Sequence, residues 1–138
     1  MSDNYSLIIK NGNCYINGKL TKIDIALSGN KIKKIGKIEL NSSKVFDATD
    51  KVVLPGIIDT QTHFREPGST DVEDLESGSS AAVLGGVTSV FEMPNTNPPT
   101  SNLIEFVKNL QLAKDRMYSN FAFYFCATPD NIFQLSKL

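Results

Sequence analysis

The sequence predicts an α/β fold in which a small antiparallel sheet precedes alternating strands and helices. Up to about Ile38, short apolar runs are separated by Asn-Gly turns, which is typical of antiparallel hairpins. After Lys51, apolar segments of strand length alternate with segments of helical spacing, and such units join parallel strands by right-handed crossovers. An open doubly wound sheet and a (β/α) barrel both fit this order of elements.

The first part of the chain contains four predicted strands. They are Leu7–Ile9, Cys14–Ile16, the alternating segment with Ile23, Ile25 and Leu27, and a segment with Ile32 and Ile35. Turns are expected at Asn11-Gly12, Asn17-Gly18 and Ser28-Gly29-Asn30, and a polar linker at Asn41-Ser42-Ser43. A sheet with one apolar face needs a second layer to cover it.

The second part begins with a predicted strand from Val52 to Ile58. A helix is predicted to begin at Thr70, because Thr70 and Glu73 have the spacing of a capping box, and Gly85-Gly86 is expected to end it. The later elements are a strand over Val87–Met93, a loop over Pro94–Thr100, a helix that Asn102 and Glu105 begin, a strand over Phe121–Ala127, and the start of another helix after Asp130.

The composition indicates an ordinary globular protein. The 14 Lys and Arg residues nearly balance the 15 Asp and Glu residues, so the net charge of -1 gives no electrostatic reason to expect nucleic acid or a membrane surface as partner. The N-terminus lacks the pattern of a signal peptide and no apolar run reaches membrane-spanning length, so a cytoplasmic protein is expected. Cys14 and Cys126 are expected to be reduced, packed thiols.

Polar residues follow the first strand of the second part. In an extended segment the side chains of Asp59, Gln61 and His63 point to one face. Two histidines two positions apart on such a face could bind one metal ion. Here His63 is the only histidine of the chain. Without the surrounding motif, a hydrogen-bonded histidine at the mouth of a barrel is the favoured interpretation of His63. Arg65 and Glu66 would then pair with each other or with neighbouring charges, and Asn95 would cap or shape its loop.

Two segments resemble a known family. Residues Asp59-Thr60-Gln61-Thr62-His63-Phe64-Arg65-Glu66-Pro67-Gly68, followed by Gly85-Gly86-Val87-Thr88-Ser89-Val90-Phe91-Glu92-Met93-Pro94-Asn95-Thr96-Asn97-Pro98, closely resemble the dihydroorotases of the amidohydrolase superfamily. Allantoinases and hydantoinases share parts of this pattern. The resemblance implies the N-terminal part of a (β/α)₈ TIM barrel preceded by a small partial β-sandwich. Residues 1–50 would form the sandwich part, and residues 51–138 the first three strands and two helices of the barrel.

The resemblance also implies a reaction and a set of site residues. The family interconverts N-carbamoyl-L-aspartate and dihydroorotate in pyrimidine biosynthesis, with zinc-bound hydroxide attacking the ring amide in the hydrolytic direction. By this resemblance Gln61 and His63 occupy the two metal positions of the first strand, and Arg65 and Asn95 bind the substrate carboxylate. Asp59 would be a supporting residue at the strand end. The remaining histidines of the family and its catalytic carboxylate have no counterpart up to Leu138, so no catalytic residue is expected within this chain.

Two departures from the family pattern modify these expectations. The amide oxygen of Gln61 is a weaker zinc ligand than an imidazole, and a TIM barrel usually needs about 250 residues and eight strands. We therefore expect a truncated dihydroorotase-like chain that is inactive alone and binds no stoichiometric zinc. The alternatives are an active enzyme completed by a complementary C-terminal polypeptide, and a non-catalytic scaffold subunit. The exposed edge of the third strand also favours self-association.

Overall fold

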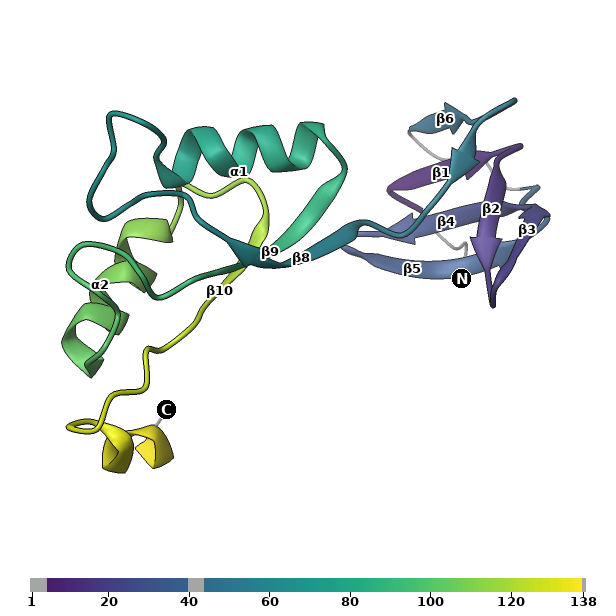
Figure 1. The fold of residues 1–138 in the computed structure, drawn as a ribbon. Coiled ribbons are helices and arrows are strands. Elements are labelled where there is room, and N and C mark those ends of the chain that lie inside the picture. Colours follow the sequence, from purple (N-terminus) through teal and green to yellow (C-terminus); the bar gives the residue numbers. More distant parts are fainter. Residues whose placement is uncertain (1–4, 40–43, 138) are drawn as a thin grey trace. The chain divides into compact units, whose positions relative to one another are not determined.

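A computed structural model describes residues 5–39 and 44–137 and shows a mixed α/β protein (Figure 1). The chain forms two compact units, residues 1–55 and residues 56–138. The polar linker expected at residues 41–43 lies outside the described residues. The assignment of the two parts to a sandwich and a barrel stays a prediction. Within the described residues, no helix is both long and apolar enough to cross a membrane.

The first unit consists of two small sheets. Its strands are β1 (Leu7–Lys10), β2 (Asn13–Ile16), β3 (Lys19–Lys22), β4 (Asp24–Ser28), β5 (Lys31–Gly36), β6 (Val45–Asp47) and β7 (Val52–Val53). One sheet has the order β5-β4-β1-β6 and the other the order β3-β2-β7. The hairpin pairs are antiparallel as predicted, whereas β6 and β7 join β1 and β2 in parallel.

Local chemistry explains the hairpins of the first unit. Asn17 and Gly18 both have positive φ, 49° and 80°, which is the backbone of the tight turn that matches the twist of two paired strands. The first unit has a buried hydrophobic cluster, formed by Tyr5, Ile8, Ala26 and Ile38. β5 lies at the edge of its sheet, and its Lys-rich, largely exposed surface is unfavourable for pairing with another strand.

The second unit has a three-stranded parallel sheet. Its elements are β8 (Ile57–Thr62), α1 (Leu75–Leu84), β9 (Val87–Glu92), α2 (Leu103–Ala113), β10 (Asn120–Phe123) and the 3₁₀ segment η1 (Ile132–Lys137). The strands follow one another in the order β10-β9-β8, with each neighbouring pair parallel. Leu75 of α1 and Ala113 of α2 pack in one buried cluster with Val90 of β9 and Phe64. The two helices therefore share one face of the sheet.

The second helix begins where the sequence predicts it, and the first does not. Asn102 caps α2, and its side chain accepts the backbone N–H of Glu105 at 3.0 Å. The predicted start of the first helix at Thr70 is wrong. Asp74 is the cap of α1, and its carboxylate accepts the N–H of Ser77 at 2.7 Å while the Ser77 hydroxyl accepts the N–H of Asp74. A serine thus takes the place that Glu73 was expected to fill.

Two predicted strands differ from the observed ones. The single strand expected over Val52–Ile58 is wrong, because Val52–Val53 pairs with β2 in the first unit and β8 begins only at Ile57. The strand predicted over Phe121–Ala127 is shorter, since β10 ends at Phe123. Asn120 to Phe123 pair with β9. Beyond the end of β10, the Tyr124 N–H donates to the backbone carbonyl of Glu92 and the Cys126 N–H donates to the backbone carbonyl of Thr100. Apolar character alone therefore overestimated the length of the strand.

Candidate functional site

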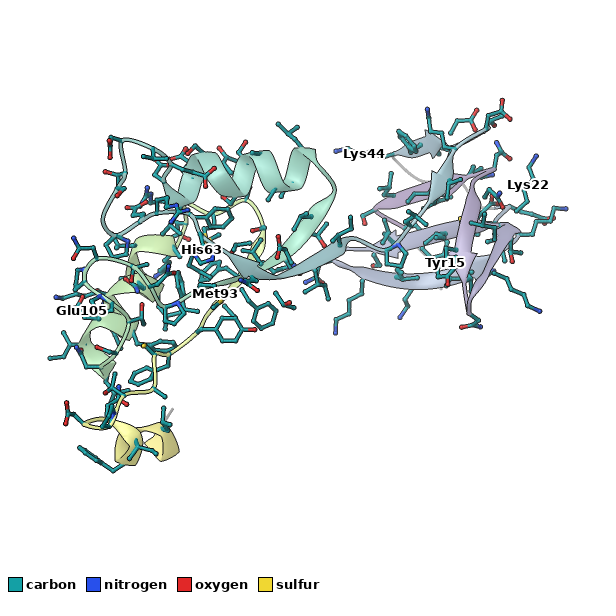
Figure 2. All side chains as sticks on the ribbon, in the orientation of Figure 1. Tyr15, Lys22, Lys44, His63, Met93 and Glu105 are labelled. Carbon is teal, nitrogen blue, oxygen red and sulfur yellow. The ribbon has the colours of Figure 1, made fainter. Side chains whose placement is uncertain are left out.

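The candidate site lies at the carboxyl ends of β8 and β9, where two loops meet (Figure 2). The Met93 N–H donates to the Thr62 carbonyl at 2.9 Å, which continues the contact between the two strands beyond the sheet. Further along, the Asn97 N–H donates to the Pro67 carbonyl at 2.9 Å. In parallel sheets, substrate sites form at these carboxyl ends because loops from neighbouring strands converge there.

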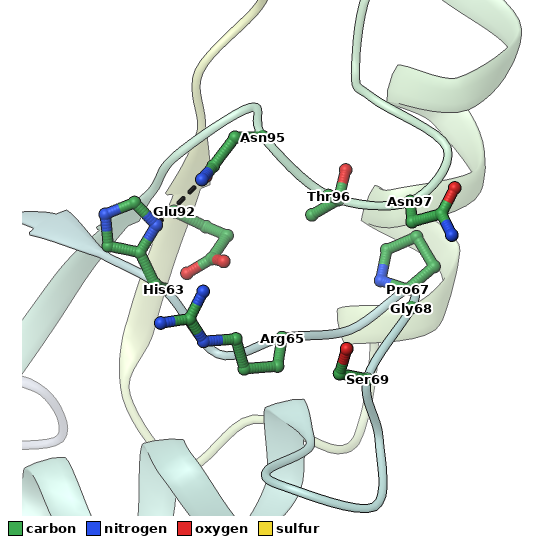
Figure 3. Close-up of a pocket in the computed structure, with 9 residues that line it drawn as sticks. All are labelled: His63, Arg65, Pro67, Gly68, Ser69, Glu92, Asn95, Thr96 and Asn97. Carbon is green, nitrogen blue, oxygen red and sulfur yellow. Dashed lines mark hydrogen bonds between the residues drawn. The ribbon is translucent and has the colours of Figure 1, made fainter.

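The two loops enclose a small hollow (Figure 3). Its lining residues are His63, Arg65, Pro67, Gly68, Ser69, Glu92, Asn95, Thr96 and Asn97. The hollow has a volume of about 80 Å³. A water molecule occupies roughly 30 Å³, and a pocket for a whole small molecule is about 300 Å³ or larger. The hollow therefore matches one polar group of a ligand, such as a carboxylate, rather than an entire metabolite.

His63 and Asn95 join the two loops by a side-chain hydrogen bond. Nδ1 of His63 lies 2.9 Å from Oδ1 of Asn95, and Figure 3 shows this contact at one end of the hollow. An amide oxygen only accepts, so Nδ1 of His63 is the donor in this contact. The Asn95 amide NH₂ group retains its donors for an anionic ligand. The plainer alternative that His63 is a hydrogen-bonded residue at a strand end is thus consistent with the same geometry.

Arg65 supplies the positive charge of the hollow. Its side chain extends toward His63 in Figure 3. Its backbone has φ 64°, a left-handed conformation that costs about 1 kcal/mol or more for a residue other than glycine. Such a conformation persists only where the surrounding contacts hold it.

Glu66 anchors the loop that carries Arg65. The alternative in which Arg65 pairs with Glu66 is wrong, because the Glu66 carboxylate instead accepts two hydrogen bonds from Arg116, at 2.8 and 3.0 Å, and the N–H of Leu75 at 3.0 Å. Arg116 follows α2 and Leu75 begins α1, so the loop is tied to both helices. The hydrogen bond from Arg116 holds the pKa of Glu66 below its usual value, although burial opposes the shift.

Glu92 is a site residue that the sequence analysis did not identify. It is the last residue of β9 and only 2% exposed, and it accepts the Phe64 N–H on both carboxylate oxygens, at 2.9 and 3.1 Å. The Thr62 hydroxyl adds a third bond at 3.0 Å. Burial raises the pKa of Glu92, while the bonds from Phe64 and Thr62 oppose that shift. The available signal was an acidic residue at the end of an apolar strand.

A chain of polar contacts shapes the loop that carries Asn95. The Thr100 N–H donates to the Pro94 carbonyl at 2.9 Å, and the hydroxyls of Thr96 and Thr100 lie 3.2 Å apart. The amide of Asn109, a fully buried residue of α2, donates to the Thr100 hydroxyl at 2.7 Å. α2 therefore supports this loop, as it supports the Glu66 loop through the adjacent Arg116.

The donor set of the described residues does not by itself suit a zinc ion. Gln61 is exposed and is not among the lining residues, and its backbone N–H donates to the Asp59 carboxylate at 2.9 Å. Among residues 5–39 and 44–137, no three His, Cys, Asp or Glu side chains come together as a metal site. Zinc normally takes four ligands from thiolate, imidazole and carboxylate groups, and the neutral amide of Gln61 is a poor substitute. The structure thus brings His63, Arg65 and Asn95 together at the hollow, and Gln61 does not line it.

Comparison with known proteins agrees with the sequence resemblance. Residues 52–131 match the amidohydrolase family. The chain is 45% identical over 103 residues to a dihydroorotase of Lactobacillus gasseri, covering 75% of this chain and 24% of that protein. It is 33% identical over 115 residues to a dihydroorotase of Thermococcus kodakarensis, covering 83% of this chain and 28% of that protein. The chain therefore spans about a quarter of the length of these relatives.

The structure agrees with the same assignment. The L-hydantoinase (dihydropyrimidinase) of Arthrobacter aurescens superposes with a TM-score of 0.89 and 29% identity, covering 96% of this chain and 30% of that enzyme. A D-hydantoinase (dihydropyrimidinase) of a Thermus species has a TM-score of 0.78 and 30% identity, again covering 30% of that enzyme. The family match, the dihydroorotase relatives and the shared fold lead to one conclusion: the chain belongs to the amidohydrolase family.

Proposed function

We propose that this chain carries the carboxylate-binding part of a dihydroorotase-like site, for N-carbamoyl-L-aspartate and dihydroorotate. The observation that carries the proposal is the convergence of Arg65 and Asn95, from two different loops, on one hollow next to His63. Arg65 offers a charged donor fork and Asn95 an amide donor, and both groups suit a carboxylate.

The site residues have distinct roles in this proposal. Arg65 and Asn95 bind and orient the substrate carboxylate, and Asn95 also holds the ring of His63 through Oδ1. His63 takes the metal-ligand position of the family, while Gln61 is non-ligating. Zinc supplies the activated hydroxide in the family. Because residues 5–39 and 44–137 assemble no zinc site of their own, no catalytic step is assigned to this chain alone.

The proposed fold of the second unit is the beginning of a (β/α)₈ barrel. The sequential order β8, β9, β10 and the packing of α1 and α2 in one cluster with Val90 support it, because an open doubly wound sheet reverses its strand order and carries helices on both faces. The partial sandwich proposed for the first unit draws support from its two small sheets.

Completion by a second polypeptide is an alternative that a specific observation favours. Ile57 and Ile58 of β8 are 55% and 61% exposed, and β8 and β10 are both edge strands of their sheet. A further chain that added strands there would cover these side chains and satisfy the free backbone groups. A purified complex with zinc and cyclase activity would establish this alternative.

The experiment that tests the carboxylate site compares two ligands that differ by one group. NMR titration of the isotopically labelled chain with L-dihydroorotate should shift the resonances of Arg65 and Asn95. Titration with 5,6-dihydrouracil, the same ring without the carboxylate, should not. Arg65→Ala should weaken dihydroorotate binding by about tenfold or more, since a charge-assisted hydrogen bond contributes about 1.5–3 kcal/mol.

The matched control is Lys108→Ala, which also removes one positive charge. Lys108 pairs with Glu105 on the surface of α2, at 2.8 Å, and does not line the hollow. Its loss should leave the dihydroorotate affinity unchanged. Equal shifts with both ligands, or an unchanged affinity in Arg65→Ala, would contradict a carboxylate site.

A further inference from the structure

The Glu92 carboxylate makes contacts that no strand ladder requires. Its oxygens accept the N–H of Phe64, which lies two residues beyond the end of β8, and the hydroxyl of Thr62, the last residue of that strand. A backbone N–H just beyond a strand usually bonds to water or to a turn carbonyl. Here a buried carboxyl group from the neighbouring strand holds it, and both of its oxygens accept the same N–H.

This contact fixes the backbone between two functional side chains. Phe64 is flanked by His63 and Arg65, and both of these line the hollow, whereas the Phe64 ring is buried in the core against Leu75 and Val90. The ring on one side and the Glu92 bond on the other leave the Phe64 peptide little freedom to rotate. The directions in which His63 and Arg65 leave the chain depend on that peptide.

A second buried carboxylate holds the other end of the same segment. The Glu66 carboxylate is tied to Arg116 and to the N–H of Leu75, at 2.8 to 3.0 Å. Arg65 therefore lies between two anchored residues, Phe64 and Glu66. This accounts for the left-handed backbone of Arg65, which a free loop would relax.

We infer that Glu92 is a positioning residue that aligns Arg65 and His63 for the substrate carboxylate, through its hydrogen bonds to Phe64 and Thr62. The inference rests on the carboxylate site proposed above. Glu92 also lines the hollow, but both of its carboxyl oxygens are already engaged with the Phe64 N–H, and a carboxyl group is a poor partner for the carboxylate of a substrate. Its role is exerted through the backbone of Phe64.

The test compares three variants of the full chain well below the melting transition of each. Glu92→Ala removes both acceptors, Glu92→Gln keeps one acceptor oxygen for Phe64, and Glu76→Gln makes the same substitution at an exposed position of α1. Amide hydrogen exchange of Phe64 reports its hydrogen bond to Glu92. The NMR order parameter of the Arg65 Nε–H reports how firmly the Arg65 side chain is held. The affinity for L-dihydroorotate reports the consequence.

Glu92→Ala should speed the exchange of the Phe64 amide by about tenfold or more and weaken dihydroorotate binding by a similar factor, since it leaves the buried Phe64 N–H without its acceptor. The amide of Val90, inside the sheet, should keep its protection. Glu92→Gln should retain most of both properties, and Glu76→Gln all of them. A purely structural role would lower the protection of Val90 and Phe64 together, with no rescue by glutamine.

Two results would overturn the inference. One is an unchanged exchange rate of the Phe64 amide in Glu92→Ala. The other is faster exchange of that amide while the order parameter of Arg65 and the affinity for L-dihydroorotate both stay unchanged. If the unaltered chain shows no carboxylate-dependent binding, the proposed function fails by itself. The order parameter of Arg65 then still decides whether Glu92 aligns it.

Discussion

Glu66 and Arg116 show how single side chains hold the candidate site together. Their side chains are 11% and 32% exposed, so the pair is partly shielded from water and stronger than a fully exposed ion pair. The pKa of Glu66 is lowered chiefly by Arg116. A carboxyl group with a lowered pKa in the folded state stabilises the fold above its unfolded pKa, and that stabilisation is lost as the pH falls through the folded pKa.

We predict that Arg116→Gln lowers the free energy of unfolding near neutral pH by about 1–3 kcal/mol, because the Glu66 carboxylate then lacks its charged partner. The loss should shrink as the pH falls below about 4.3, where Glu66 is protonated in the unfolded chain. Urea denaturation from neutral to acid pH measures it. Lys108→Gln is the control, because its exposed pair contributes about 0–1 kcal/mol. Parallel stability curves for Arg116→Gln and the unaltered chain would contradict this assignment.

By the sequence resemblance, Gln61 occupies one of the two metal positions of the first strand, where the family has a histidine. We predict that Gln61→His, made in the 138-residue chain, gives neither tight stoichiometric zinc binding nor cyclisation. Two imidazoles at positions 61 and 63 supply only half of the four ligands that zinc takes. Competition with a chromogenic zinc indicator measures the affinity, with His63→Ala as the control. One tightly bound zinc per chain would show that other residues of this chain complete the site.

At the scale of elements, α1 must approach the site closely. Gly78 of α1 faces the ring of Phe64, and a Cβ at Gly78 would lie 2.3 Å from Phe64 Cδ1. Helical glycine is unfavourable by about 1 kcal/mol relative to alanine, so this position retains it for space rather than for helix stability. The packing of α1 and the direction of the chain at Phe64 are thus coupled.

Gly78→Ala should therefore destabilise the protein by about 1–3 kcal/mol, because the added methyl group forces Phe64 to move in a packed core. The same substitution at Gly85, the C-cap of the same helix, has its nearest neighbours at 3.4 Å and a φ of -82°. It should change stability by less than about 0.5 kcal/mol or increase it. Thermal or urea unfolding compares the two. Equal effects at both glycines would contradict the close contact.

At the scale of the molecule, apolar side chains remain on the surface of the sheet in the second unit. Ile57 and Ile58 of β8 are 55% and 61% exposed, and a hollow lined by Ile58, Phe91 and Phe121 runs across the strands. Exposed apolar surface next to edge strands favours association. We expect the purified 138-residue chain to fold with marginal stability and to self-associate.

Ile58→Lys should shift the chain toward monomer at micromolar concentrations, because it places a charge on this surface. It should change the free energy of unfolding little, because the Ile58 side chain is already 61% exposed. Sedimentation velocity measures the effect. Val72→Lys, at a 72% exposed position in the loop before α1, is the control and should leave association unchanged. A cooperative, monomeric unaltered chain would contradict the expectation.

The sequence by itself determined the alternation of strands and helices in the second unit, the turn at Asn17-Gly18, the cap at Asn102, and the family, because each depends on local chemistry or on a contiguous motif. The strands β3 and β6 of the first unit were not predicted. It did not determine the start of α1 or the division of Val52–Ile58 between two sheets, because those depend on which partner each segment meets. Only the tertiary structure showed that Glu66 pairs with Arg116, fifty positions away, and that Glu92 holds Phe64. Buried carboxylates take whichever donors the fold brings to them, and donors so distant in the chain leave no local pattern in the sequence.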